Sequence, residues 1–195
     1  EAAKTAGLQH VIWSTFEDTR KKWPLTSDAA PTLMGKYKVP HFDSKAEADG
    51  EFTSRGVPTT FLLTSFYWEN MIFFGLGPKK GPDGTLAITF PLADKKMPGM
   101  TAEDIGKCAY GILKRGQEFI GKYVGVAGEH LTGAQMASAL SKALGREVRY
   151  NSVTPGMYRS FGFPGAEDMG NMFQYKRDFE LEYCAARNLD LCRQL

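Results

Sequence analysis

The chain has 195 residues, 43% of them hydrophobic and 24% charged, which is the composition of an ordinary folded protein with one core, or one core and a small lobe. Its formal net charge is only +2 and no block of Lys and Arg stands out, so we expect no direct contact with nucleic acid. No stretch approaches the roughly 20 consecutive apolar residues of a membrane-spanning helix, and we expect no membrane partner.

The cysteines and the first residues bear on the cellular compartment. Cys108, Cys184 and Cys192 form no Cys-x-x-Cys motif and no metal-ligand spacing with the histidines. We therefore expect no metal site and reduced, intracellular thiols, in a protein of the cytoplasm, with the nucleus also open. Residues 1–7 lack the apolar segment of a signal peptide and begin within a helical pattern, which suggests a truncated chain.

The first half of the chain alternates predicted helices and strands. Residues 1–6 are helix formers that end at Gly7, and residues 8–14 are apolar and β-branched, as in a buried strand. Residues 15–40 are polar and rich in proline, and a structureless stretch of this length is usually a functional loop.

A second helix and strand complete the pattern. Residues 42–55 favour a helix that ends at Gly56, and residues 59–63 read as another buried strand. The order strand, loop, helix, strand predicts a parallel sheet with a right-handed crossover.

The second half mixes the two kinds of element. In chain order, its residues predict a turn at 82–84, a strand at 86–90, a helix from the N-cap Thr101 to about Arg115, a strand at 123–126, a helix that Leu131-Thr132 opens and Gly145 caps, a strand at 148–153, a helix beginning at Pro155 and a mostly helical tail from Ala166.

Three short segments, at His41–Glu47, Arg55–Thr60 and Phe66–Asn70, follow the patterns H-F-D-x-K-x-E, G-V-P-x-T and Y-x-E-N. These segments resemble the NmrA-like family of the atypical short-chain dehydrogenase superfamily. Further matches occur in the same order at Pro82–Gly84, Met97–Met100, Glu103–Gly106, Lys122–Gly125 and Phe161–Ala166. No single segment is specific, but their order and spacing are. The resemblance is closest to the HSCARG-type NADPH sensors, and plant isoflavone reductases and bacterial quinone reductases are more distant relatives.

This resemblance implies an α/β fold. Residues 1–80 would form the C-terminal part of a Rossmann-type parallel sheet that binds NAD(P). Residues 81–195 would be a mixed region with a smaller α+β lobe for a substrate or partner, with residues 100–126 packing back on the sheet. The glycine-rich loop that binds pyrophosphate in this fold is not in the sequence. The only lookalike, Gly75–Gly81, follows no predicted strand, so we expect the N-terminal half with the dinucleotide loop to be absent.

Two residues of the first family segment could take part in catalysis. His41 and Lys45 are spaced i, i+4 and lie on one face if this segment is helical. In the superfamily a Tyr-x-x-x-Lys pair occupies this place, and here His41 stands for the Tyr. His41 could donate a proton or merely shape the pocket, and Lys45 could bind the cofactor or be a solvated helix lysine. A true Tyr-x-x-x-Lys, Tyr110–Lys114, falls in another predicted helix, and we interpret it as chance.

The resemblance also implies a cofactor site at the ends of the strands. Tyr67, Trp68, Glu69 and Asn70 follow the strand at 59–63, and ligands bind at the carboxyl edge of such sheets. By resemblance this segment lines the nicotinamide pocket, although Tyr67 and Trp68 could instead pack between two lobes. Ser14 ends the preceding predicted strand and would face the same crevice.

The predicted ligand is NADP, with NAD as the other candidate. The leading interpretation is an NAD(P)(H)-binding redox sensor that acts on a regulatory protein partner or as a homodimer. The alternatives are an NAD(P)H-dependent reductase of quinones or similar carbonyls, in which Lys45 is catalytic, and a structural subunit with a vestigial pocket.

Overall fold

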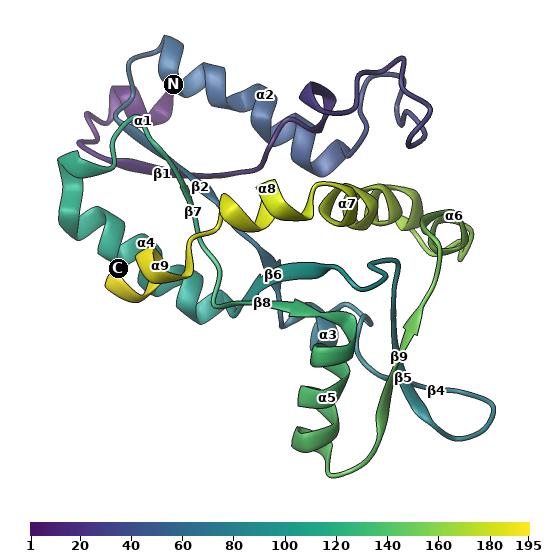
Figure 1. Ribbon diagram of the computed structural model, residues 1–195. Coiled ribbons are helices and arrows are strands. Elements are labelled where there is room, and N and C mark those ends of the chain that lie inside the picture. Colours follow the sequence, from purple (N-terminus) through teal and green to yellow (C-terminus); the bar gives the residue numbers. More distant parts are fainter.

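The protein has an α/β fold with three small sheets, whose strands alternate with helices along the chain (Figure 1). The structure is a computed structural model and describes residues 1–195. The first sheet is entirely parallel, with β1 (Val11–Thr15), β2 (Thr59–Leu63) and β7 (Tyr123–Gly125) in the order β1-β2-β7. All of β2 is buried, because it lies between two strands and beneath helices, which explains its uninterrupted apolar and β-branched sequence. The predicted parallel sheet is therefore confirmed.

The first strand begins later than the sequence predicts. A strand was expected from Leu8, yet β1 starts at Val11, which is paired with Thr59. The partner strand can begin only after Pro58, because proline has no N–H for the ladder. Residues 8–10 therefore have no strand beside them, and Gly7 (φ 62°) separates them from the short helix α1 (Ala2–Thr5).

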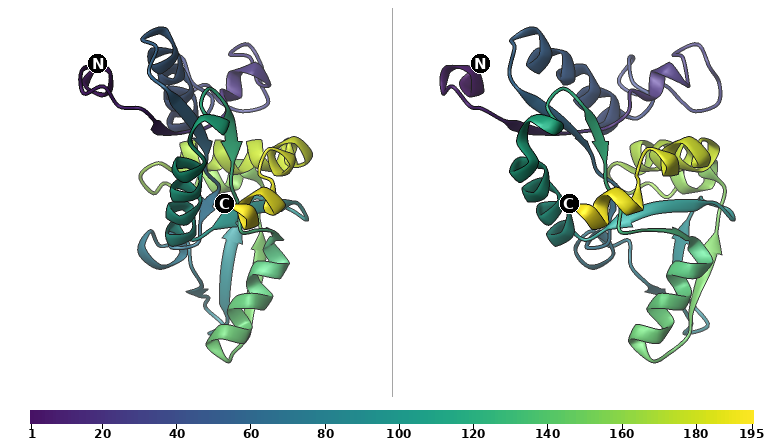
Figure 2. Two further views of the ribbon diagram at one scale, coloured as in Figure 1. Left: turned by 90° about the vertical axis from the view of Figure 1, so that its left-hand side faces the viewer. Right: turned by 60° about the vertical axis from the view of Figure 1, so that its left-hand side comes forward.

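Two further sheets form the rest of the molecule. In the second, β6 (Lys96–Met100) runs parallel to β3 (Phe66–Tyr67) and antiparallel to β8 (Glu129–Thr132). In the third, β5 (Leu86–Phe90) lies between β4 (Lys79–Lys80) and β9 (Val148–Ser152). Figures 1 and 2 show this third sheet, with α5 (Gly133–Leu144), extending away from the β1-β2-β7 sheet.

The remaining helices are α2 (Pro40–Ser54), α3 (Asn70–Phe73), α4 (Ala102–Arg115), α6 (Pro155–Arg159), α7 (Ala166–Asp178), α8 (Glu180–Ala185) and α9 (Leu189–Gln194). The predicted helical tail is confirmed, as is the Thr101 cap of α4, whose hydroxyl accepts from the Asp104 N–H. The start expected at Leu131 is wrong, because Leu131 is in β8 and α5 begins only after the N-cap Thr132. None of the helices is both long and apolar enough to cross a membrane.

The loop between β1 and α2 is ordered by one buried carboxylate. We expected residues 15–40 to be without structure, but they contain a 3-10 turn at Thr19–Lys21. One oxygen of Asp43 accepts from the Thr19 N–H and hydroxyl, at 2.8 and 2.7 Å. The other accepts from the N–H groups of Lys38 and Val39, at 2.8 and 3.0 Å. Because Asp43 is fully buried, these four hydrogen bonds fasten both ends of the loop to the start of α2.

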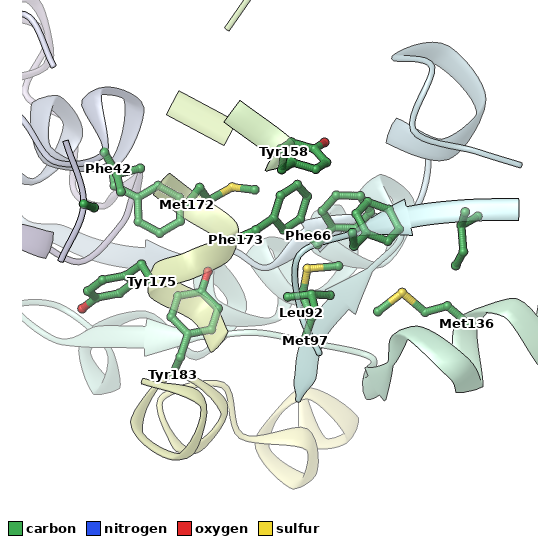
Figure 3. Close-up of a cluster of buried hydrophobic side chains, with 14 of the residues drawn as sticks. Phe42, Phe66, Leu92, Met97, Met136, Tyr158, Met172, Phe173, Tyr175 and Tyr183 are labelled. Atoms are coloured by element: carbon green, nitrogen blue, oxygen red, sulfur yellow. The ribbon is translucent and has the colours of Figure 1, made fainter. Parts of the chain in front are cut away.

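A large apolar cluster joins the loop and α2 to the later elements. It includes Phe42 of α2, Phe66 of β3 and Phe90 of β5. Phe173 of α7 lies at the middle of this cluster, with its ring 6.2 Å from Phe66 and 5.2 Å from Phe90 (Figure 3). A second, smaller cluster holds α4 against β2 and β7. Through Phe173, helix α7 packs directly against Phe66, which follows strand β2 of the parallel sheet.

Candidate functional site

The candidate site lies at the carboxyl edge of the parallel sheet, where β1 and β2 end side by side. Arg187, in the turn between α8 and α9, fixes this edge. Its guanidinium makes two hydrogen bonds with the carboxylate of Glu17, at 2.6 and 3.0 Å, and donates to the Thr64 carbonyl at 3.0 Å. Glu17 lies just beyond β1 and Thr64 just beyond β2, so this buried side chain connects the two strand ends.

Lys45 projects from α2 over the end of β1. Its Nζ lies 3.4 Å from the hydroxyl of Ser14 and 5.3 Å from the centre of the Phe16 ring. Partial burial lowers the pKa of Lys45 below its ordinary value. No carboxylate oxygen lies within 4.0 Å of the ammonium, so the charge has no acidic partner within the protein. Two predicted site residues, Ser14 and Lys45, are thus brought together.

His41 shares this face of α2, as its spacing from Lys45 predicts. Helix α2 begins at Pro40, and the His41 ring lies edge-on to Phe16 at 6.2 Å. Its Nδ1 is 2.7 Å from a carboxylate oxygen of Asp168, in the first turn of α7. His41 therefore joins α2 to α7. This geometry favours a pocket-shaping role for the histidine, while its role as a proton donor stays a prediction.

An aromatic platform lies beneath these polar groups. The rings of Phe16 and Phe42 stack face to face, with centres 4.1 Å apart and an interplanar angle of 3°. Phe42 is fully buried, whereas Phe16 is only partly covered. Phe16 therefore offers a flat apolar surface directly below the Lys45 ammonium.

The four residues of the segment Tyr67–Asn70 lie in different environments. The hydroxyl of Tyr67 lies 3.4 Å from that of Thr64, at the end of β2. Glu69 accepts from the Ala102 N–H at 2.9 Å and so helps to cap α4. Asn70 is the first residue of α3.

Trp68 lies in a different environment. Its ring covers the backbone of Gly99 so closely that a Cβ on this glycine would be 2.0 Å from the indole. It also lines an apolar pocket of about 300 Å³ between α3, β8 and α5, with Met71, Leu131 and Leu140 among the other lining residues. These contacts are those of an aromatic residue that packs between two parts of the molecule, which was the alternative interpretation of Tyr67 and Trp68.

A buried lysine of α7 was missed by the sequence reasoning. Lys176 is only 2% exposed, and its Nζ lies within 6.0 Å of the ring centres of four aromatic residues, Phe42, Phe66, Phe173 and Tyr183. Burial, reinforced by the charge of Arg187, lowers the pKa of Lys176 to about 7. One signal was available: Met169, Met172 and Phe173 form a helical apolar face on which position 176 is the next member.

The two lookalike motifs lie elsewhere. Tyr110 and Lys114 are both on the exposed face of α4, with the Lys114 ammonium 5.6 Å from the tyrosine ring centre. The glycine-rich segment Gly75–Gly81 follows helix α3, as expected for a segment that is not a phosphate loop.

Comparison with known proteins gives a consistent set of similarities. A family model described as the NmrA-like family matches residues 1–192. The nitrogen metabolite repression protein nmrA of Emericella nidulans is 30% identical over 162 residues, which cover 78% of this chain and 42% of that protein. An NAD(P)H azoreductase of Xenophilus azovorans is 26% identical over 153 residues, covering 78% of this chain and 47% of the azoreductase.

Solved structures agree with these sequence similarities. Crystal structures of NmrA, a negative transcriptional regulator, in complex with NAD and with NADP each superpose with a TM-score of 0.75 and 25% identity. Each superposition covers 99% of this chain and 62% of the NmrA chain. The chain therefore spans less than half of the two curated relatives and less than two thirds of the NmrA structures.

Proposed function

The chain belongs to the NmrA-like family, and from this premise we propose that it binds NADP(H) or NAD(H) at the carboxyl edge of the β1-β2-β7 sheet. We further propose that it is a redox-sensing regulator, which reports the bound form of the nucleotide to a protein partner or within a homodimer. The NmrA structures with NAD and NADP support the ligand class. The observation that carries the proposal is the position of Lys45.

Lys45 fits a dinucleotide because its charge is available. The ammonium is held over Phe16 and beside Ser14, at the edge where open α/β sheets bind ligands, and no carboxylate neutralises it. It can therefore donate to the ribose hydroxyls or phosphates of the nucleotide. Phe16 would support an apolar or aromatic face of the ligand, and Tyr67 would border it from the end of β2.

A sensor is favoured over an enzyme by the neighbouring histidine. A carbonyl reductase needs a group that delivers a proton next to the nicotinamide, and in the superfamily a tyrosine does this. His41 takes that position, and its Nδ1 is already engaged with Asp168 of α7. The contact connects the proposed ligand edge to the C-terminal helices, so a change at the ligand can be transmitted to α7.

Residues outside the 195 described would complete the site. The pyrophosphate group of a dinucleotide is normally held by a glycine-rich turn after a parallel strand, and none of the strands here is followed by one. The outer side of β1 is unpaired, since β1 is at the edge of its sheet. We propose that a further parallel strand and its glycine-rich turn are added at this edge.

The test replaces Lys45 with methionine, which keeps the apolar stem and removes the charge. Charge-assisted hydrogen bonds contribute about 1.5–3 kcal/mol each, so Lys45→Met should weaken NADPH binding by roughly 10- to 100-fold in the full-length protein. The matched control is Lys114→Met, on the exposed face of α4. Calorimetric titration measures both variants, and equal affinities of wild type and Lys45→Met would refute the proposed site.

Reduction of a substrate by bound NAD(P)H is the second candidate. It is favoured by the similarity to the Xenophilus azovorans azoreductase and by the Lys45–Ser14 pair at the site. An NADPH-oxidation screen with azo compounds, quinones and aldehydes distinguishes the two functions. The sensor proposal predicts slow turnover or none. A turnover number of around 10 s⁻¹, the median for enzymes, that is lost in Lys45→Met would instead establish the reductase.

A further inference from the structure

Two cysteines lie close together where the C-terminal helix packs on α4, beside the residues that follow β7. Cys108 is buried in the middle of α4, and Cys192 is half-buried in α9. The Cys108 thiol donates to the carbonyl oxygen of Cys192, with 4.0 Å between the sulfur and the oxygen. The Cys192 sulfur also accepts from the Ala127 N–H, at 3.3 Å.

The close approach of the two helices depends on a glycine. A Cβ on Gly111 of α4 would lie 2.1 Å from the carbonyl oxygen of Leu195. Leu191 and Leu195 pack on the apolar cluster that contains Cys108. None of the ion pairs joins α9 to α4, since Arg193 pairs with Asp190 inside α9. Apolar packing and the two cysteines therefore hold α9 in place.

The surroundings give the two thiols different reactivities. Hydrogen bonding to Cys192 and burial raise the pKa of Cys108, which therefore keeps its proton. The interaction with Cys108 and the Ala127 N–H lower the pKa of Cys192, so that among the three cysteines it is the one that loses its proton most readily. Burial raises the pKa of the third cysteine, Cys184, to about 11. Since thiolates are the reactive form, Cys192 should be the first to be oxidised.

A small oxidant can reach the pair from solvent. Cys108 and Cys192 both line a surface pocket of about 200 Å³, together with Ala127, Gly128 and Leu195. Cys192, which loses its proton readily, thus lies beside the protonated Cys108 at a pocket open to solvent. This is the arrangement of an attacking and a resolving cysteine.

We propose that Cys192 and Cys108 form a redox-modification site, in which a hydroperoxide converts the pair into an intrachain disulfide between α9 and α4. In the first step the Cys192 thiolate attacks one peroxide oxygen. The O–O bond breaks, a sulfenic acid forms on Cys192, and the leaving hydroxide or alkoxide takes up a proton. In the second step the Cys108 thiol loses its proton and attacks the Cys192 sulfur. The S–S bond forms, the S–O bond breaks, and the oxygen leaves as water. An external thiol would reverse the oxidation.

The test uses the full-length protein and hydrogen peroxide. After brief exposure to about one equivalent of peroxide, free thiols are blocked with N-ethylmaleimide and the digest is analysed by mass spectrometry. The expected product is a cross-linked peptide pair containing Cys108 and Cys192, which dithiothreitol separates, while Cys184 is alkylated. Alkylation of all three cysteines, or oxidation of Cys184 before the other two, would overturn the proposal.

Two variants separate the roles of the thiols. Cys184→Ser should form the same disulfide at the same rate. Cys108→Ser should leave a sulfenic acid on Cys192 that dimedone labels, and it should form no cross-link. Because the wild-type protein and Cys184→Ser are sufficient for the decision, a folding defect in Cys108→Ser would not obscure it. Absence of dimedone labelling at Cys192 in a folded Cys108→Ser variant would contradict its role as the attacking thiol.

Discussion

Replacing Lys176 by methionine should stabilise the protein, in a manner that depends on pH. The ammonium of Lys176 is buried among aromatic rings, and burial lowers its pKa from 10.5 to about 7. Between these pH values the unfolded chain binds a proton that the folded protein does not. The free energy of unfolding therefore rises with pH from about 7 to 10.5, and below 7 the burial penalty is fully present.

The size of the effect can be worked out from the same contacts. Each pKa unit corresponds to about 1.4 kcal/mol, so a pKa lowered from 10.5 to about 7 costs the folded state on the order of 5 kcal/mol below pH 7. Methionine has a similar length and no charge, so we expect Lys176→Met to be more stable by a comparable amount, on the order of 5 kcal/mol, at pH 6.

Urea denaturation of wild type and Lys176→Met at pH 6, 8 and 10 measures this difference. The gain should shrink steadily as pH rises from 7 towards 10, because the wild-type lysine is neutral in the folded state and the proton that the unfolded chain must release on folding is lost more easily at higher pH. Lys114→Met, on the exposed face of α4, is the control and should show no such trend. A Lys176→Met variant that is less stable than wild type at pH 6, or a gain that stays constant from pH 6 to 10, would refute the reasoning.

Two other substitutions test how the site is held. Arg187→Met removes one partner of a buried ion pair and leaves Glu17 uncompensated, so the free energy of unfolding in urea should fall by about 3 kcal/mol or more; an unchanged midpoint would show that the strand ends do not need this side chain. Gly99→Ala places a Cβ 2.0 Å from the Trp68 indole and should cost about 1–3 kcal/mol and shift the tryptophan emission. Gly106→Ala, in α4 with no atom near its Cβ, is its control and should be neutral or stabilising.

The sequence predicts best those elements whose signals are local. Strand β2 matches the predicted residues because five apolar or β-branched residues lie between a proline and polar residues. Helix α4 follows from the Thr101 cap, and α5 ends at Gly145, whose φ of 65° suits glycine. These features depend on a few neighbouring residues, so no tertiary information is needed.

Strand β6 was not predicted, because its sequence disfavours a strand. Strand β6 contains Pro98 and Gly99, which both disfavour a central strand. It forms because β8 pairs with it on one side and the Trp68 ring fills the space above Gly99. Both contacts come from residues far away in the sequence, and nothing within residues 96–100 indicates them.

Some contacts of the candidate site could likewise be predicted from the sequence, and others could not. The spacing of His41 and Lys45 predicts that they share a face of α2, and the order of strands predicts that Ser14 lies near them. The bonds of Arg187 with Glu17, 170 positions earlier in the chain, could not be foreseen, because they depend on how the C-terminal helices cross the sheet edge.

The most direct test of the proposed ligand site is an NMR titration of the isotopically labelled full-length protein with NADPH. The proposal predicts that backbone amide shifts concentrate at the ends of β1 and β2, around Ser14, Phe16, Thr64 and Tyr67, and at Lys45 of α2. Shifts that instead concentrate around the apolar pocket beside Trp68 and α5, with the β1 and β2 ends unchanged, would contradict it.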